Sequence, residues 1–407
     1  MKSVRTNIST LRQIIELVPG HLVKHLSKKY GIDKKSRSFT PWSHVTTMMY
    51  SQLAHSLSLN DVCDALKNNQ NSLLTIRGAV PPSRNGLSHA NKVRDAGMAE
   101  ELFWLVLEHL HTLSPGFRSK TYIGMPQRFK RTINVVDSTT ISLVANCMTW
   151  AKHRRRKAAA KLHMCLDLQS FLPRFAVFDA AKHSDPAKAY EVCAGLKAGE
   201  IVVFDKAYVD FKHLNLLNER EVFWVTRAKD NMQYKVIEEH SVKNNGKILR
   251  DQTIMLTITN TYKQYPGTFR LVEAMVERNG KEEPMTFITN NVEWATSSIC
   301  DLYKARWSVE VFFKQIKQTL QLCDFMGYSA NAIRWQVWTA MLVYILLRFL
   351  AYSGQWPHSF NRLFTMLRGI LWLKFNLFNI IASYGTACAA NRMRAAPEQA
   401  YLPGFAQ

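Results

Sequence analysis

The chain has 407 residues, of which 47% are hydrophobic and 21% charged, a globular composition that excludes a largely disordered protein. Its formal net charge of +22 favours a polyanionic partner, nucleic acid before membrane. The seven cysteines include no Cys-x-x-Cys pair, which argues against a zinc site or a disulfide framework and favours the reducing cytoplasm.

The first part of the chain, residues 1–128, is predicted to form a helical domain. Apolar residues recur at helical spacing from Leu11 onwards, and a helix is expected over Trp42–Leu57 with Ser58 as the cap of the next one. Basic connectors join these helices, so DNA binding is one interpretation of the domain. A purely scaffolding role is the other, because no recognition helix can be singled out.

From Arg131 the pattern changes to strands that carry acids. Residues 132–143 are rich in β-branched side chains and contain Asp137, and residues 200–208 form an apolar run that ends at Asp205. Two further strands are expected over 157–169 and 172–178. An Asp at the end of a strand is most often a turn residue or a helix cap, so each acid has a purely structural alternative.

A dense basic loop lies between the strands expected at 132–143 and 157–169. It contains Arg154, Arg155 and Arg156. Such a run is often no more than a solvated face, but in a chain this basic it is also a candidate for phosphate contacts.

Residues 222–289 alternate between strand-like runs and turns, and their two Asn-Gly pairs at Asn245 and Asn279 indicate hairpins. We interpret them as a β-rich insertion. Further on, residues 336–352 are very apolar but short for a membrane span and interrupted by Arg348, so a buried core helix is favoured and no membrane partner is expected.

The stretch Asp301–Lys317 lacks Gly and Pro and is predicted to be one amphipathic helix. At about 100° per residue its polar side chains fall in an arc of about 80° and form one stripe about 20 Å long. They are Tyr303, Arg306, Glu310, Lys314 and Lys317. The stripe holds one carboxylate among cations, which suits metal binding beside phosphate contacts. An ordinary surface helix with ion pairs four residues apart is the alternative.

If Asp137, Asp205 and Glu310 converge, they can hold two divalent cations, with Asp137 bridging both. An all-oxygen site of this kind suits Mg²⁺, and Mn²⁺ is also possible. Two such ions would activate the attacking oxygen and stabilise the leaving oxygen in phosphodiester substitution.

The spacing Tyr303-x-x-Arg306-x-x-x-Glu310-x-x-x-x-x-x-Lys317 resembles the Tyr-Arg-Glu-Lys signature of bacterial DDE transposases of the insertion-sequence-four family. The strands that carry Asp137 and Asp205 resemble that family's first two acidic motifs. The resemblance implies an α/β fold: an RNase H-like core, built as a mixed five-stranded sheet with flanking helices, interrupted by a β-rich insertion and preceded by a helical domain.

The same resemblance implies a function. It implies cut-and-paste movement of an insertion sequence, with Asp137, Asp205 and Glu310 as catalytic metal ligands and Tyr303, Arg306 and Lys317 on phosphates at the transposon end. Lys314 and the arginines of the basic loop are further candidate DNA contacts. The expected partners are double-stranded DNA, as inverted-repeat ends and as target, and a second copy of the chain in the DNA complex, acting at the bacterial nucleoid.

We expect five segments in the chain. They are the helical domain at 1–128, the first part of the core at 129–220, the insertion at 221–295, the second part of the core with the Glu-bearing helix at 296–355, and a C-terminal helical segment and tail at 356–407. Two other functions share these motifs: a metal-dependent nuclease that does not join strands, and a DNA-binding protein with an inactive core.

Overall fold

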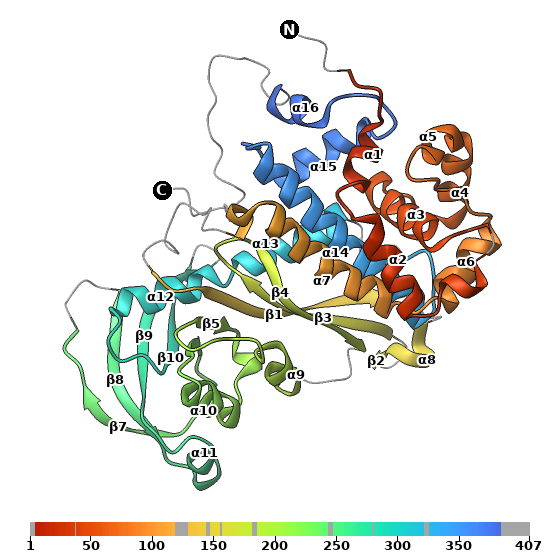
Figure 1. Ribbon diagram of the computed structural model, residues 1–407. Coiled ribbons are helices and arrows are strands. Elements are labelled where there is room, and N and C mark those ends of the chain that lie inside the picture. The colour runs from red at the N-terminus through yellow and green to blue at the C-terminus, as the bar shows by residue number, and fades with distance from the viewer. Residues whose placement is uncertain are drawn as a thin grey trace. The chain divides into compact units, whose positions relative to one another are not determined.

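A computed structural model describes residues 5–36, 38–118, 129–143, 147–154, 157–180, 185–242, 247–278, 281–320 and 325–383 (Figure 1). The chain divides into two compact units. The first comprises the described residues of Met1–Phe117, Ile141–Ala159 and Phe313–Gln399, and the second those of Arg118–Thr140 and Ala160–Phe312. The sequence-based division into five segments remains a prediction.

The first unit consists mainly of helices packed around one long apolar helix. This helix, α14 (Ala330–Ser353), contacts α3 (Pro41–Ala54), α6 (Arg84–Val93), α7 (Gly97–Leu113) and α15 (Phe360–Gly369). The other elements of the unit are α1 (Thr10–Ile15), α2 (Gly20–Lys29), η1 (Asp33–Lys35), α4 (Leu59–Asn68), α5 (Gln70–Leu74), η2 (Pro115–Arg118), α8 (Met148–Ala151), β2 (Lys152–Arg154), η6 (Gln315–Thr319) and α16 (Leu377–Ser383).

Local chemistry explains where these helices begin. Thr40 caps α3 by accepting a hydrogen bond from Ser43 N, with Pro41 at the first helical position. The predicted cap at Ser58 is confirmed, because Ser58 and Asp61 form a reciprocal capping box at the start of α4. Within the described residues α14 alone is long and apolar enough to cross a membrane, but 78% of its most apolar window is buried against protein. It is therefore a core helix, as the sequence indicated.

The second unit is built on a mixed sheet. Its core strands lie in the order β4-β3-β1-β5-β6, which are Leu172–Ala180, Lys157–Asp167, Ile133–Leu143, Ile201–Phe204 and Phe223–Arg227. Strand β5 runs parallel to both β1 and β6, whereas β3 and β4 are antiparallel. The expected α/β fold with a mixed five-stranded core sheet is confirmed.

The strands of the predicted insertion continue this sheet instead of forming a separate one. Strand β10 (Lys281–Thr289) pairs antiparallel with β6, and β9 (Phe269–Arg278), β8 (Ile248–Leu256) and β7 (Tyr234–Glu239) follow in turn. Antiparallel pairing of β9 with β10 and of β7 with β8 agrees with the two predicted hairpins, although the Asn-Gly pairs themselves lie outside the described residues.

Helices cover both faces of the core sheet. On one face α9 (Asp185–Val192) and α10 (Phe211–Glu219) bury Val192 and Leu214 in a cluster with Val136, Val202 and Phe204 of the strands. On the other face α12 (Thr296–Ala305) packs on β5, β6 and β10. The remaining elements of the unit are η5 (Lys206–Tyr208), α11 (Thr259–Gln264) and the start of α13 (Ser308–Lys314).

Candidate active site

The pairing of two parallel strands brings Asp137 beside Asp205. In the β1–β5 ladder Val135 pairs with Val203 and Val136 with Phe204, so Asp137 and Asp205 are the next residues of the two chains in the same register. Side chains alternate along a strand, and Val136 and Phe204 point into the cluster under α9 and α10. Both acids therefore face the opposite side, where α12 lies.

The third acid comes from a helix that is not continuous. The prediction of one regular helix over Asp301–Lys317 is wrong: α12 ends at Ala305, two turn residues follow, and α13 begins at Ser308. At the junction Arg306 N bonds Tyr303 O at 3.1 Å and Glu310 N bonds Trp307 O at 3.0 Å, a three-residue spacing tighter than an α-helix. The chain then widens into a π-helical turn at Gln315–Thr319.

This change of pitch rotates the polar side chains away from the uniform stripe that was predicted. The sequence offers no Gly or Pro to mark the break. Its physical reason is tertiary: Arg306 is buried, at 7% exposure, and its guanidinium pairs with Asp137 of the sheet. Such contacts outweigh helix propensity, which differs little between ordinary residues.

Two side chains at this junction connect the three acids. Arg306 Nη1 donates to Asp137 Oδ2 at 2.8 Å, and Arg306 Nη2 lies 3.5 Å from Glu310 Oε1. The hydroxyl of Tyr303 donates to Asp205 Oδ1 at 3.0 Å. The structure thus brings Asp137, Asp205 and Glu310 into one neighbourhood, around Tyr303 and Arg306.

The electrostatics of the site reflect this crowding of charges. The pKa of Asp137 is raised to about 6, chiefly by burial and to a smaller extent by the carboxylates of Asp205 and Glu310, against the opposing effects of Arg306 and the Ser138 N–H. Burial, followed by the neighbouring Asp205, also raises the pKa of Tyr303 above its ordinary value, which keeps its phenol protonated as a hydrogen-bond donor.

A second polar network lies on the other face of β1 and was not predicted. Ser138 Oγ donates to Asp185 Oδ1 at 3.0 Å, Lys161 Nζ bonds the same carboxylate at 2.9 Å, and Tyr208 OH lies 3.0 Å from His163 Nδ1. His163 and Tyr208 are each only 1% exposed. The sequence held one faint signal, since Tyr208 follows Asp205 by three residues and so belongs to the second acidic motif.

The predicted cationic contacts belong to the first unit. Lys314 is exposed at the end of α13, and Lys317 is half-buried in the π-helical turn. Arg154 ends strand β2, and the structure describes its backbone alone. Arg155 and Arg156 lie outside the described residues.

The three acids Asp137, Asp205 and Glu310 are candidate ligands of a divalent cation. In the described parts of the chain no group of three or more His, Cys, Asp or Glu side chains is placed to hold a metal ion. The arrangement instead pairs Asp137 with the Arg306 guanidinium. The donors themselves, three neighbouring carboxylates with no sulfur or imidazole among them, are those that hard cations such as Mg²⁺ and Mn²⁺ prefer. The residue types therefore fit a divalent cation, provided that Arg306 moves.

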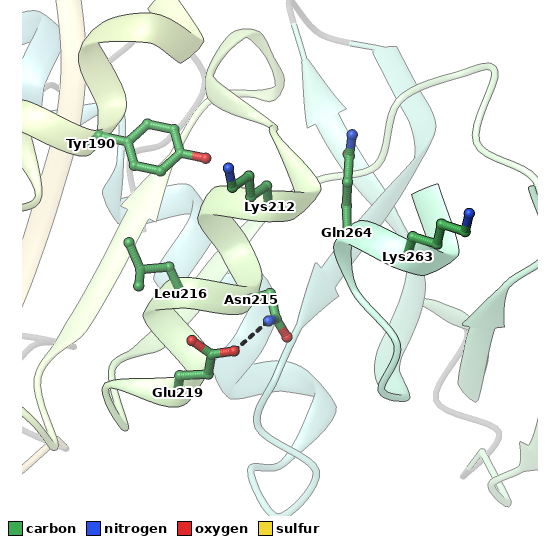
Figure 2. A pocket seen from close by; sticks show the side chains of 7 residues that line it. All are labelled: Tyr190, Lys212, Asn215, Leu216, Glu219, Lys263 and Gln264. Carbon is green, nitrogen blue, oxygen red and sulfur yellow. Dashed lines mark hydrogen bonds between the residues drawn. The ribbon is translucent and has the colours of Figure 1, made fainter. Parts of the chain in front are cut away.

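A surface pocket of about 340 Å³ lies elsewhere in the second unit (Figure 2). Its side chains come from α9, α10 and α11, and Figure 2 shows the bond from Asn215 to Glu219, 2.7 Å long, on its α10 wall. None of the three acids lines it. It also holds only one carboxylate, Glu219, so it does not compete with the acid cluster as a candidate catalytic centre.

Comparison with known protein families gives two matches along the chain. A model described as a transposase DDE domain matches residues 128–346, just over half of the chain. A model described as a domain of unknown function (DUF4372) matches residues 6–76.

Individual relatives agree with the first match. A Sinorhizobium fredii (strain NBRC 101917 / NGR234) protein that carries the transposase name y4zB is 29% identical over 67% of this chain and 72% of its own length. A Geobacillus stearothermophilus protein, named as a transposase for insertion sequence element IS5377, is 29% identical over 55% of this chain and 58% of its own length. Transposase InsG for insertion sequence element IS4 of Escherichia coli (strain K12) is 25% identical over 48% of this chain and 46% of its own length.

Among solved structures, a piggyBac transposase synaptic complex with hairpin DNA aligns with a TM-score of 0.44 and 8% identity, covering 93% of this chain and 83% of the other.

Proposed function

The chain belongs to the transposase DDE domain family, and from this membership we propose that it moves an insertion sequence by a cut-and-paste reaction. The family resemblance found in the motifs is thereby confirmed, and with it the expectation of an enzyme that acts on DNA. The finer proposal is that the protein hydrolyses phosphodiester bonds at inverted-repeat ends and joins the freed 3′ ends to target DNA.

One observation carries this proposal: the β1–β5 register sets Asp137 beside Asp205, and Arg306 links Asp137 to Glu310. Asp137, Asp205 and Glu310 would hold two divalent cations, Mg²⁺ or Mn²⁺. When bound, these ions would activate the attacking oxygen and stabilise the leaving oxygen. Tyr303 orients Asp205 through its hydroxyl, which fixes the direction of that carboxylate's lone pairs.

The two chemical steps use one kind of substitution at phosphorus. In the first, the oxygen of water bonds to phosphorus and the 3′ oxygen at the element's end leaves with a proton. In the second, that 3′ hydroxyl attacks a phosphodiester of the target DNA, and the target's own 3′ oxygen leaves. No external energy source is needed, because each step exchanges one P–O bond for another.

The DNA is proposed to be gripped by cations outside the acid cluster. Lys314, Lys317 and the arginines Arg154, Arg155 and Arg156 would contact phosphates, in keeping with the net charge of +22. Two copies of the chain would each hold one end of the element. The reaction would take place in the bacterial cytoplasm, at the nucleoid.

The test uses a labelled duplex that carries the inverted repeat found beside the coding region, with a supercoiled plasmid as target. Glu310→Gln should reduce cleavage and joining by more than about 100-fold, since it removes a direct metal ligand and even outer-shell changes cost 10–100-fold. Binding of the duplex should persist. Glu282→Gln, at an exposed position of β10, is the matched control and should remain active.

The outcomes separate the proposed function from its alternatives. Full activity of Glu310→Gln in Mg²⁺ would refute the assignment of the acids. Cleavage by the wild-type protein without joining would indicate a nuclease. Binding without cleavage, in Mg²⁺ and in Mn²⁺, would indicate an inactive DNA-binding protein.

A further inference from the structure

Arg306 lies among the acids that we propose as the cation ligands. Its guanidinium donates to Asp137 Oδ2 at 2.8 Å, approaches Glu310 Oε1 at 3.5 Å, and is buried, with 7% of the residue exposed. We infer that Arg306 is an internal counter-ion that exchanges its carboxylate partners for a DNA phosphate, so that the transposon end and the divalent cations bind cooperatively. This inference rests on the proposed function, because it takes the three acids to be the metal site.

Arg306 and a divalent cation would compete for the same carboxylate. A divalent cation held by Asp137 would need the carboxylate charge that the Arg306 guanidinium now balances, and the two cations would repel each other at short range in a partly buried site. In the absence of DNA, therefore, ion binding must first break the Arg306–Asp137 pair. Without the guanidinium, the negative charge of the acids would be uncompensated, and their affinity for a divalent cation would therefore increase.

The hydrogen-bonding capacity of Arg306 is also incompletely satisfied in its present position. Its Nε is buried and makes no hydrogen bond within the described residues, which leaves a donor desolvated without compensation. Its second acid partner is also a weak one, since the contact is long and the Glu310 side chain is 51% exposed. A phosphate offers two oxygens to the planar fork of an arginine and would satisfy more of its donors at once.

The other contacts of the guanidinium are only weakly directional. It lies 5.5 Å from the ring centre of Tyr303 and 5.7 Å from that of Trp307, so aromatic faces attract the charge without fixing its direction. Arg306 also stands in the two-residue turn between α12 and α13, outside the regular hydrogen bonding of either helix. A change at this turn can redirect the side chain without unwinding a helix.

Thermodynamic linkage then makes the effect reciprocal. If the DNA end withdraws Arg306 from Asp137 and so tightens ion binding by some factor, bound ions must tighten DNA binding by the same factor. The coupling belongs to Arg306 and should vanish when its charged fork is removed.

The experiment measures ion binding and needs no catalysis. Free Mn²⁺ is titrated by electron paramagnetic resonance against the full-length protein, alone and with a duplex that ends at the cleaved transposon end in a 3′-dideoxynucleotide. For the wild type we expect the duplex to tighten Mn²⁺ binding by about tenfold, within the usual range of coupling between sites. Arg306→Gln without DNA should bind Mn²⁺ about tenfold tighter than the wild type, and the duplex should then change its affinity by less than about threefold.

Two matched variants exclude simpler explanations. Lys304→Gln removes the same charge from an exposed position of α12 two residues away and should behave like the wild type. Arg306→Lys keeps the charge but loses the planar guanidinium. Its Mn²⁺ affinity without DNA should stay close to that of the wild type, while the duplex should increase that affinity less than it does for the wild type. A thermal melt of each variant verifies that it is folded.

The inference is overturned if folded Arg306→Gln binds Mn²⁺ no more tightly than the wild type without DNA, or if its response to the duplex is unchanged. A failure of the proposed function looks different: Mn²⁺ binding would then be insensitive to Glu310→Gln and to Asp137→Asn. If those two substitutions abolish binding while Arg306→Gln has no effect, the acids are the ion site and only the role of Arg306 is wrong.

Discussion

Replacing Tyr303 by Phe tests whether the signature tyrosine orients an acid or contacts a phosphate. Tyr303 is 4% exposed, and its hydroxyl gives Asp205 a hydrogen bond of 3.0 Å. A hydrogen bond to a charged group contributes about 1.5–3 kcal/mol, and about 1.4 kcal/mol corresponds to a factor of ten in rate. If the bond is needed to hold Asp205 in its reactive direction, Tyr303→Phe should slow cleavage by about 10- to 150-fold.

The assay is single-turnover cleavage of a labelled end at saturating protein, combined with end binding over a series of salt concentrations. The orienting role predicts a lower rate at saturation and an unchanged dependence of binding on salt. Tyr262→Phe, on the exposed surface of α11, is the control and should alter neither quantity. The orienting role is refuted if Tyr303→Phe keeps the wild-type rate at saturation while its binding weakens and depends less on salt, since that is the behaviour of a lost phosphate contact.

Two predictions concern stability. Burial, with a smaller contribution from Arg94, lowers the pKa of His44 to about 3. Below pH 6.5 His44 is protonated in the unfolded chain, whereas in the folded chain it stays neutral down to about pH 3. The free energy of unfolding should therefore fall by about 1.4 kcal/mol per pH unit as the pH drops between these two values. The free energy of unfolding, measured by urea titration at pH values from 7.5 to 5, should depend on pH less steeply in His44→Gln, by that amount per pH unit. An equal pH dependence in the two proteins would contradict the prediction. Arg270 and Asp251 form a pair between β9 and β8 with a contact of 2.7 Å and side-chain exposures of 8% and 7%. Arg270→Met should cost about 3–5 kcal/mol in urea unfolding because it strands a buried charge, whereas adding Asp251→Leu should recover most of the loss, and a single variant as stable as the double one would count against this account.

The strands that carry the candidate acids could be predicted from the sequence because the pattern that identifies them is local. Runs of β-branched and apolar residues identify β1 and β5, and the acids follow at positions where such buried strands give way to polar groups. The register between the two strands, by contrast, cannot be predicted from a local sequence pattern. The pairing of Val136 with Phe204 decides that Asp137 and Asp205 are neighbours, and it depends on how two distant segments pack in three dimensions.

The same limit explains the error at the signature helix. Within Asp301–Lys317 every residue tolerates a helix, so the periodic pattern predicts a regular one. The break at Arg306 arises because Asp137, far away along the chain, attracts its guanidinium into the interior. The residues next to Arg306 in the sequence do not indicate this contact. The network of Asp185, His163 and Tyr208 was missed for the same reason, since its members come from three separate elements.

Side chains on both faces of strand β1 bond to it at Asp137 and Ser138. On one face Arg306 balances Asp137, and on the other Ser138 is fixed by Asp185, whose charge is in turn balanced by Lys161. Asp137 and Asp185, on the two faces of the strand, are thus each balanced by a cation. If Arg306 leaves for a phosphate, the Ser138 anchor still holds the backbone, so Asp137 gains free charge without gaining freedom to turn away. A site arranged in this way can change partners while its position stays fixed, which the exchange between DNA and metal requires.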